Sequence, residues 1–146
     1  MSLRELYQEM IIDHGRQPRN FGLLDKASHQ HAGHNPLCGD KLMVYVKLVN
    51  NVIDDVRFDG AGCAISVASA SLMTESIKGK SIEDVNALFE LFHHLVTEGQ
   101  EPAQSIGKLA VFSGVAEFPV RVKCATLAWH TLKAALANDP NTVSTE

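Results

Sequence analysis

Three cysteines, each in a distinctive local setting, constrain this 146-residue chain more than any other feature. Cys38 lies in the run Asn-Pro-Leu-Cys-Gly-Asp at 35–40, Cys63 follows Gly-Ala-Gly, and Cys124 follows Arg-Val-Lys. Three thiolates and the carboxylate of Asp40 would complete a four-coordinate metal shell with three sulfur ligands and one oxygen ligand. Cys38, Asp40, Cys63 and Cys124 are therefore candidate metal ligands.

The simpler interpretation is that these cysteines are core residues. Free cysteines are among the most buried residue types and pack as small hydrophobes. Cys124 fits this interpretation best, because its helix carries Ala125 and Ala128 and has room for a buried thiol. The long separations between the three cysteines also match no compact zinc motif. The local sequence around each cysteine, and not the spacing, favours a metal site.

Composition and charge restrict the other classes of function. At 146 residues and 45% hydrophobic content, we expect one domain over 1–146, with a flexible tail at 141–146. A formal net charge of -4 argues against a nucleic-acid surface. No secretory signal or membrane-spanning run is found, so we expect no membrane partner. An odd count of three cysteines favours a reducing cytoplasm, where thiols are free or bound to metal.

The hydrophobic pattern predicts a mixture of helices and strands. Apolar residues at helical spacing begin at Leu3 and stop near His14, and a long polar surface loop is expected over 16–40. Two alternating runs around Asn50-Asn51 predict a hairpin that Asp40 enters. The remaining predictions are helices over 64–77, from 81 to about 94 and over 119–136, with a loop and a short helical piece between 97 and 115.

These elements place two of the thiols near helix starts. Cys63 directly precedes the helix over 64–77, and Cys124 lies in the first turns of the last helix. Free backbone N–H groups at a helix start lower the pKa of a thiol. Arg121 and Lys123 would also favour a thiolate at Cys124. We therefore expect lowered thiol pKa values at both Cys63 and Cys124.

The cysteine motifs carry a resemblance to a known family. The runs at 35–40 and 60–66, with Ala-Ser-Ala-Ser-Leu-Met-Thr-Glu at 68–75, resemble the iron–sulfur cluster assembly family typified by IscU, SufU and the N-terminal domain of NifU. The resemblance covers roughly Leu3 to Leu136. It implies an α+β fold of the SufE/NifU type, with a small three-stranded, mainly antiparallel sheet packed against about five helices. It also implies that Cys38, Asp40, Cys63 and Cys124 face one site.

The segment near the third cysteine resembles the SufU branch of that family. IscU-type scaffolds typically carry a histidine just before this cysteine, where this chain has Lys123, and extra sequence falls within 93–117. This resemblance implies a bound Zn²⁺ and a sulfurtransferase-type acceptor rather than a stand-alone enzyme. Cys38 would take persulfide sulfur from a pyridoxal-phosphate-dependent cysteine desulfurase of the SufS type and pass it to downstream iron–sulfur assembly proteins. Zinc would protect the thiolates without redox chemistry of its own.

Two other functions remain open for the same four residues. They could hold iron or a transient 2Fe–2S cluster, which would make the chain a scaffold for cluster assembly, or a purely structural zinc ion.

Residues outside the four candidate ligands carry weaker signals. Arg121 is a candidate for partner docking or for stabilising anionic sulfur, and an ordinary surface charge is the alternative. His29, His31 and His34 are expected to be incidental residues of a polar loop.

Overall fold

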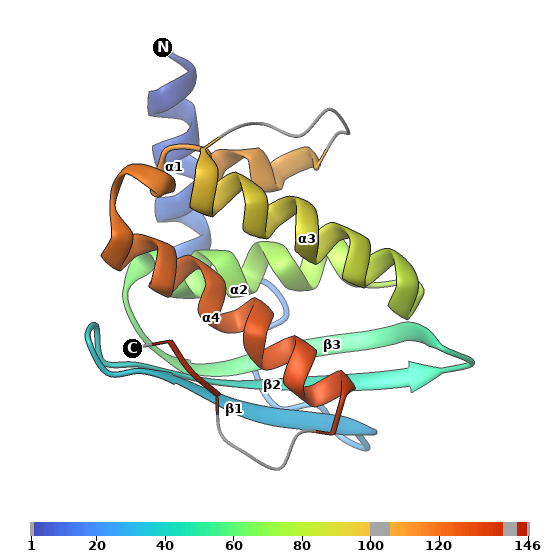
Figure 1. Ribbon diagram of the computed structural model, residues 1–146. Helices are drawn as coiled ribbons and strands as arrows, with labels where there is room; N and C mark the ends of the chain where they lie inside the picture. The colour runs from blue at the N-terminus through green and yellow to red at the C-terminus, as the bar shows by residue number, and fades with distance from the viewer. Residues whose placement is uncertain (1, 100–105, 139–142, 146) are drawn as a thin grey trace.

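The computed structural model describes residues 2–99, 106–138 and 143–145. In these residues, one sheet lies under a layer of helices (Figure 1). The elements run in the order α1 (Leu3–Arg16), β1 (His29–Asn35), β2 (Asp40–Val49), β3 (Val52–Ala61), α2 (Ala64–Ile77), α3 (Ile82–Glu98), the 3-10 helices η1 (Gly107–Phe112) and η2 (Val115–Glu117), α4 (Pro119–Leu136) and β4 (Val143–Ser144). None of the helices in this part of the chain has the length and apolar content needed to cross a membrane.

The predicted α+β class is confirmed, and the sheet has one strand more than expected. Its order is β3-β2-β1-β4, with β1 and β3 antiparallel to β2 and the two-residue β4 parallel to β1. Val143 and Ser144 therefore belong to the sheet, although a flexible tail was expected there. The other residues of that tail are Thr145, whose backbone N–H donates to the carbonyl of His34, and residues outside the described part of the chain.

Strand β1 corrects the prediction of a loop over 16–40. Its sequence, His-Gln-His-Ala-Gly-His-Asn, lacks the β-branched and aromatic residues that favour strands. Pairing with β2 over its whole length, and burial of His31, Gly33 and Asn35 on one face, hold the segment extended. Gly33 is needed at its position because a Cβ there would collide with the side-chain hydroxyl of Thr131 on α4. Tertiary contacts override the weak local propensity.

The helix predictions are confirmed, with small differences at the ends. α2 and α4 have the predicted bounds, whereas α3 continues to Glu98, past the expected end near His94, and stops at Gly99 in the left-handed conformation. The Ser81 side chain caps α3 by accepting from the backbone N–H of Asp84. The short helical piece predicted between 97 and 115 is 3-10 helix, in η1 and η2.

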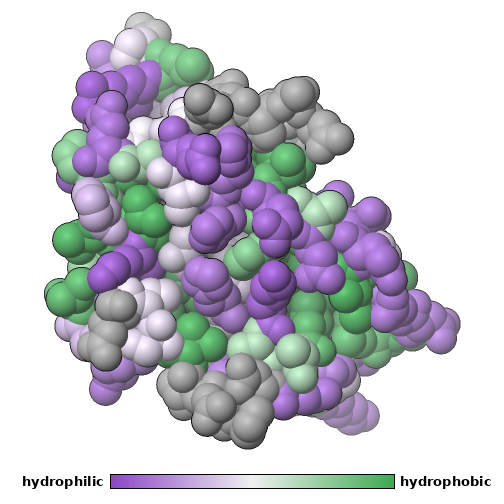
Figure 2. All heavy atoms as spheres, viewed as in Figure 1, coloured by the Kyte–Doolittle hydropathy of each residue, from purple (hydrophilic) through white to green (hydrophobic). Residues whose placement is uncertain are grey.

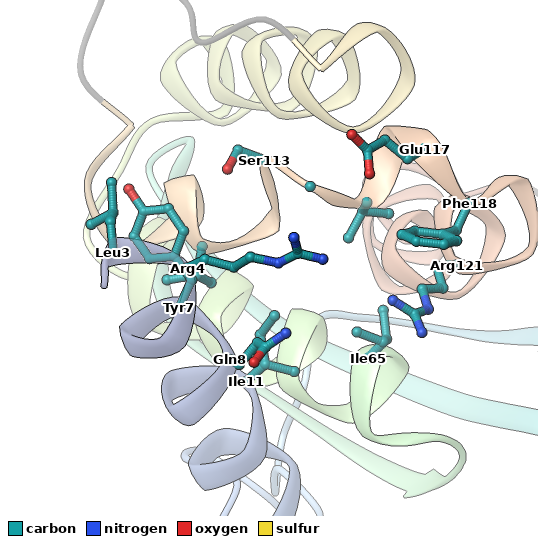
Figure 3. Close-up of a pocket in the computed structure, with 13 residues that line it drawn as sticks. Leu3, Arg4, Tyr7, Gln8, Ile11, Ile65, Ser113, Glu117, Phe118 and Arg121 are labelled. Carbon is teal, nitrogen blue, oxygen red and sulfur yellow. The ribbon is translucent and has the colours of Figure 1, made fainter. Parts of the chain in front are cut away.

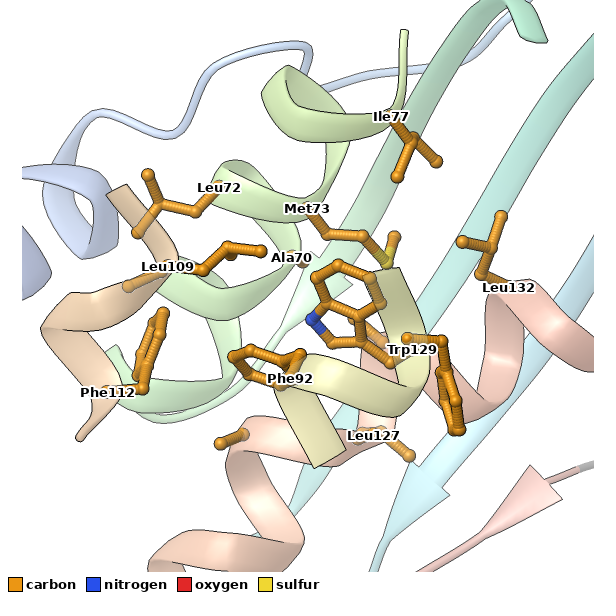
Figure 4. Close-up of a cluster of buried hydrophobic side chains, with 14 of the residues drawn as sticks. Ala70, Leu72, Met73, Ile77, Phe92, Leu109, Phe112, Leu127, Trp129 and Leu132 are labelled. Atoms are coloured by element: carbon orange, nitrogen blue, oxygen red, sulfur yellow. The ribbon is translucent and has the colours of Figure 1, made fainter. Parts of the chain in front are cut away.

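The core lies between the sheet and the helices. α2 packs over β3, and α4 packs over β1 and β2, while α3 lies against α4 on the side away from the sheet (Figure 1). Trp129 of α4 is fully buried and stacks on Phe92 of α3, with ring centroids 4.7 Å apart (Figure 4). Large buried aromatic side chains contribute much of the stability of such a core. The shared core holds α2 and α4 against the sheet, and both helices carry candidate ligands at or near their starts.

Candidate metal centre

The candidate ligands meet at one end of the sheet. β1 and β2 are joined by a four-residue turn, Pro36 to Gly39, with Cys38 in the turn and Asp40 at the start of β2. Gly39 adopts a φ of 69°, a conformation that glycine allows at little cost. β3 ends next to this turn, and Cys63 follows it as the N-cap of α2. The α4 helix supplies Cys124 from its second turn.

Three of the four predicted ligands form a cluster. One sulfur each from Cys38 and Cys124 and one carboxylate oxygen of Asp40 all lie within 4.8 Å of one another. The two sulfurs are 3.1 Å apart. Asp40 is fully buried and Cys124 nearly so, whereas Cys38 is half-buried. Two thiols and a buried carboxylate at this separation suit a thiolate-preferring dication such as Zn²⁺.

Cys63 stands beside this cluster, and its sulfur is not a member of it. The Cys63 sulfur accepts a hydrogen bond from the backbone N–H of Ser66 at 3.5 Å, so it caps its own helix. Its backbone N–H donates to Oδ1 of Asp40 at 2.8 Å. Hydrogen bonding with the Cys124 side chain lowers the pKa of the Cys63 thiol to about 7, and the free N–H groups at the start of α2 act in the same direction. The Cys63 thiol can therefore ionise near neutral pH.

The pKa of the Cys124 thiol is raised, whereas the sequence predicted that it would be lowered. Hydrogen bonding with the Cys63 and Cys38 side chains, together with burial, raises the pKa of the Cys124 thiol. Cys124 lies beyond the first turn of α4, where the free N–H groups are found, and its side chain faces the other thiols. Lys123 instead lines a separate cavity of about 640 Å³ beside Thr126 and Val143. The predicted lowering of the pKa at Cys124 is wrong for the protein without metal.

A buried carboxylate needs hydrogen-bond donors, and Asp40 has two. Oδ1 accepts from the backbone of Cys63, and Oδ2 accepts from the side-chain amide of Asn35 at 3.2 Å. Gly62 makes room for this arrangement, because a Cβ at that position would lie 2.5 Å from Oδ1 of Asp40. Asn35 and Gly62 were not singled out from the sequence. Their positions within the cysteine motifs were the signal that the sequence offered.

Arg121 lies outside the ligand cluster, in a groove of about 530 Å³ formed by α1, the start of α2, η1, η2 and the start of α4. Its guanidinium group sits 4.3 Å from the centre of the Phe118 ring, a cation–π contact. Figure 3 shows Arg4 and Arg121 on opposite sides of this groove, with Tyr7 beside Arg4 and Ile65 beside Arg121. Arg121 is exposed and lies three residues before Cys124.

The histidines considered from sequence do not join the cluster. His29, His31 and His34 lie on β1, and His31 is buried with Nδ1 2.9 Å from the carbonyl oxygen of Ala32. In the described residues, the group with metal-ligand geometry contains none of these histidines. Figure 2 shows mainly hydrophilic residues in the centre of the face that carries α3 and α4.

Comparison with known proteins identifies relatives over nearly the whole chain. The family model described as NifU-like N-terminal domain matches residues 6–144. The "Zinc-dependent sulfurtransferase SufU" of Bacillus subtilis is 40% identical over 140 residues, covering 94% of each chain. The "Iron-sulfur cluster assembly scaffold protein IscU" of Streptococcus pyogenes is 41% identical over 140 residues, covering 95% of this chain and 87% of the relative.

A solved structure agrees with these relatives. The putative iron–sulfur cluster assembly scaffold protein for the SUF system from Fervidobacterium islandicum superposes with a TM-score of 0.84 at 32% identity, covering 92% of this chain and 99% of the other. The resemblance inferred from the cysteine motifs is thus confirmed in sequence and in fold. The chain belongs to the NifU-like N-terminal domain family of iron–sulfur cluster assembly proteins.

Proposed function

We propose that this chain is a zinc-dependent sulfur acceptor, with Cys38, Asp40, Cys63 and Cys124 as the residues that hold the metal and Cys38 as the acceptor. The proposal rests on a difference between the ligands in burial and in the type of element that holds them. Asp40 and Cys124 are buried in a strand and a helix, while Cys38 is half-buried in a turn beside a glycine with positive φ. Of the clustered ligands, Cys38 is the one that can move without disturbing a regular element.

The chemistry of the donor set supports zinc. When bound, zinc supplies a redox-inert Lewis acid that keeps thiolates deprotonated and protected from oxidation. The low pKa of the Cys63 thiol lets that residue enter the shell at neutral pH, and its backbone already bonds to Asp40. The Bacillus subtilis relative is named as a zinc-dependent sulfurtransferase. Lys123, which stands just before the third cysteine, offers no imidazole as a competing ligand.

Sulfur transfer to Cys38 is a thiolate exchange in which atoms and charge balance. The Cys38 thiolate attacks the outer sulfur of a persulfide on a cysteine desulfurase, and a new S–S bond forms. The S–S bond of the donor breaks, and the desulfurase cysteine leaves as a thiolate. No external oxidant or reductant is consumed. The expected donor is a pyridoxal-phosphate-dependent enzyme of the SufS type, and downstream iron–sulfur assembly proteins would receive the sulfur from Cys38.

We assign Arg121 to docking of that partner or to stabilising the anionic sulfur. Its exposed guanidinium group is held beside Phe118, itself 40% exposed, on the groove next to the starts of α2 and α4. A charged group that is oriented by an aromatic contact loses less entropy when a partner binds than a free side chain would.

A second candidate function is assembly of a 2Fe–2S cluster on the same residues. Thiolates suit iron as well as zinc, and the Streptococcus pyogenes relative is named as a scaffold. Metal analysis of protein purified without oxygen distinguishes the sulfur-acceptor function from the scaffold function. A colourless protein with one zinc per chain supports the acceptor. A reconstituted cluster that transfers to an apo-protein supports the scaffold.

The acceptor function is tested by mixing the zinc-loaded chain with desulfurase and cysteine and mapping persulfide by mass spectrometry. Persulfide should appear on Cys38 and should be lost in Cys38→Ser. A Cys38→Ser variant that unfolds would instead identify the zinc as structural.

A further inference from the structure

Asn35 contacts two candidate ligands with a single amide group. It is the last residue of β1, fully buried, and pairs across the turn with Asp40. Its Nδ2 donates to Oδ2 of Asp40 at 3.2 Å and to the sulfur of Cys124 at 3.4 Å. Since a carboxylate and a thiolate are both acceptors, only the NH₂ end of the side chain can face them. The orientation of this amide is thereby set by the ligands.

The other end of the Asn35 side chain supports a role beyond folding. Its Oδ1 is buried and has no hydrogen-bond partner in the described structure. Burying an amide oxygen without a partner is unfavourable, and an apolar side chain of the same shape would avoid that cost. We therefore attribute the presence of an asparagine at this position to the hydrogen bonds that its NH₂ group donates to Asp40 and Cys124.

The ligands differ in how much support the rest of the chain gives them. Asp40 accepts two hydrogen bonds, the Cys63 sulfur accepts one from Ser66, and the Cys124 sulfur accepts one from Asn35. Within the described residues, the Cys38 sulfur has a hydrogen bond only with the Cys124 thiol. That bond needs a thiol proton, which is lost when both sulfurs become metal ligands.

We propose that Asn35 is the positioning residue that makes Cys38 the exchangeable ligand. Its amide holds Asp40 and Cys124 together as a fixed pair, and its N–H···S bond stabilises charge on Cys124 and makes that sulfur a poorer nucleophile. Cys38 receives no such bond and keeps its full reactivity. This inference rests on the proposed function, because it explains why sulfur would go to Cys38 and not to Cys124.

The test compares zinc-loaded wild type with Asn35→Leu, which is close in shape and lacks the amide, without any desulfurase present. Thr131→Val is the matched control, because it removes an equally buried hydrogen bond on α4, from Oγ1 to the carbonyl of Leu127. Two quantities are measured: zinc affinity by competition with a chromophoric chelator, and the order in which a limiting alkylating agent modifies the three cysteines, mapped by mass spectrometry.

In wild type and in Thr131→Val, Cys38 should be alkylated first and the zinc affinity should be equal. In Asn35→Leu, the affinity should fall about 10- to 100-fold, as for other groups that orient metal ligands, and Cys124 should lose its protection relative to Cys38. A folded Asn35→Leu protein that keeps both the affinity and the order of alkylation would overturn the proposal.

A measurement on the wild-type chain covers the case in which Asn35→Leu does not fold. With ¹⁵N labelling, the side-chain NH₂ signals of Asn35 should shift on zinc loading and exchange slowly with water. Asn35 signals that stay at the values of an exposed amide would contradict the proposal. Because no desulfurase is present, these results are independent of whether Cys38 accepts sulfur. A failure of sulfur transfer in the wild type would contradict the proposed function and leave the zinc measurements on Asn35 intact.

Discussion

The backbone N–H of Cys63 donates to the Asp40 carboxylate at 2.8 Å, so the start of α2 and the start of β2 are joined directly at the candidate metal centre. One residue earlier, Gly62 leaves the space that the carboxylate occupies. This contact links two segments that are remote in sequence, and it fixes Asp40 before any metal is present.

Gly62→Ala should weaken metal binding without unfolding the chain. The new Cβ would lie 2.5 Å from Oδ1 of Asp40, so the carboxylate must move out of its place. We expect zinc affinity to fall by about tenfold or more, as for other changes that disturb the setting of a metal ligand. Gly114→Ala is the control, because a Cβ there meets no atom within 4 Å. Chelator competition measures both variants, and equal affinities would refute the role given to Gly62.

Arg121→Ala should slow sulfur transfer while leaving the metal in place. Arg121 is outside the ligand cluster, so the zinc content should equal that of wild type. The rate of persulfide formation at limiting desulfurase should fall by about tenfold, the effect of losing roughly 1.4 kcal/mol of binding. Arg57→Ala, on the exposed side of β3, is the matched control. Loss of zinc in Arg121→Ala, or an equal slowing in Arg57→Ala, would show that Arg121 has no specific role in transfer.

In the metal-free protein, the cysteines should differ in the pH at which they are alkylated. The pKa of Cys63 is about 7, so its alkylation rate should rise with a midpoint near pH 7. Hydrogen bonding and burial raise the pKa of Cys124, so Cys124 should stay nearly unreactive through this range. Iodoacetamide labelling at a series of pH values, read by peptide mass spectrometry, checks this order. Faster labelling of Cys124 than of Cys63 at pH 7 would be inconsistent with it.

The fold should lose stability in mild acid because of His14, which is buried at the end of α1. Its Nδ1 lies 2.7 Å from the Ser71 hydroxyl and can accept its proton only when the ring is neutral. Burial lowers the pKa of His14 below its usual 6.5, so the unfolded chain takes up the proton first. The free energy of unfolding should therefore fall as the pH drops below about 6.5.

Urea unfolding of the metal-free chain between pH 7.5 and 5 measures this dependence. His14→Gln removes this titrating group and should make the curve shallower in that range. Burial also lowers the pKa of His130, which remains in the variant. If His14→Gln and wild type keep the same slope, His14 is not the source of the acid sensitivity.

The sequence was sufficient for the parts of the fold that local patterns determine. The hairpin around Asn50-Asn51 and the bounds of α2 and α4 follow from turn residues, apolar periodicity and Pro119 at a helix start. Strand β1 could not be found in this way, because its polar residues become a strand only through pairing with β2 and packing against Thr131. The short β4 strand likewise depends on β1.

The candidate site, like the fold, could be predicted from the sequence only in part. Residue types and motifs were enough to nominate Cys38, Asp40 and Cys124, which the fold brings together. The roles of Asn35 and Gly62 depend on distances across the turn and between β3 and α2, which a one-dimensional pattern does not contain. The pKa of Cys124 was mispredicted for a similar reason, since the thiols that surround it come from distant segments.

The most direct test of the account is the site of the persulfide. Zinc-loaded wild type and Cys38→Ser are each incubated with a SufS-type desulfurase and cysteine, and the persulfide is trapped by alkylation and mapped by mass spectrometry. The account predicts persulfide on Cys38 in the wild type and none on the folded, zinc-containing Cys38→Ser protein. Persulfide on Cys63 or Cys124 that persists unchanged in Cys38→Ser would contradict it.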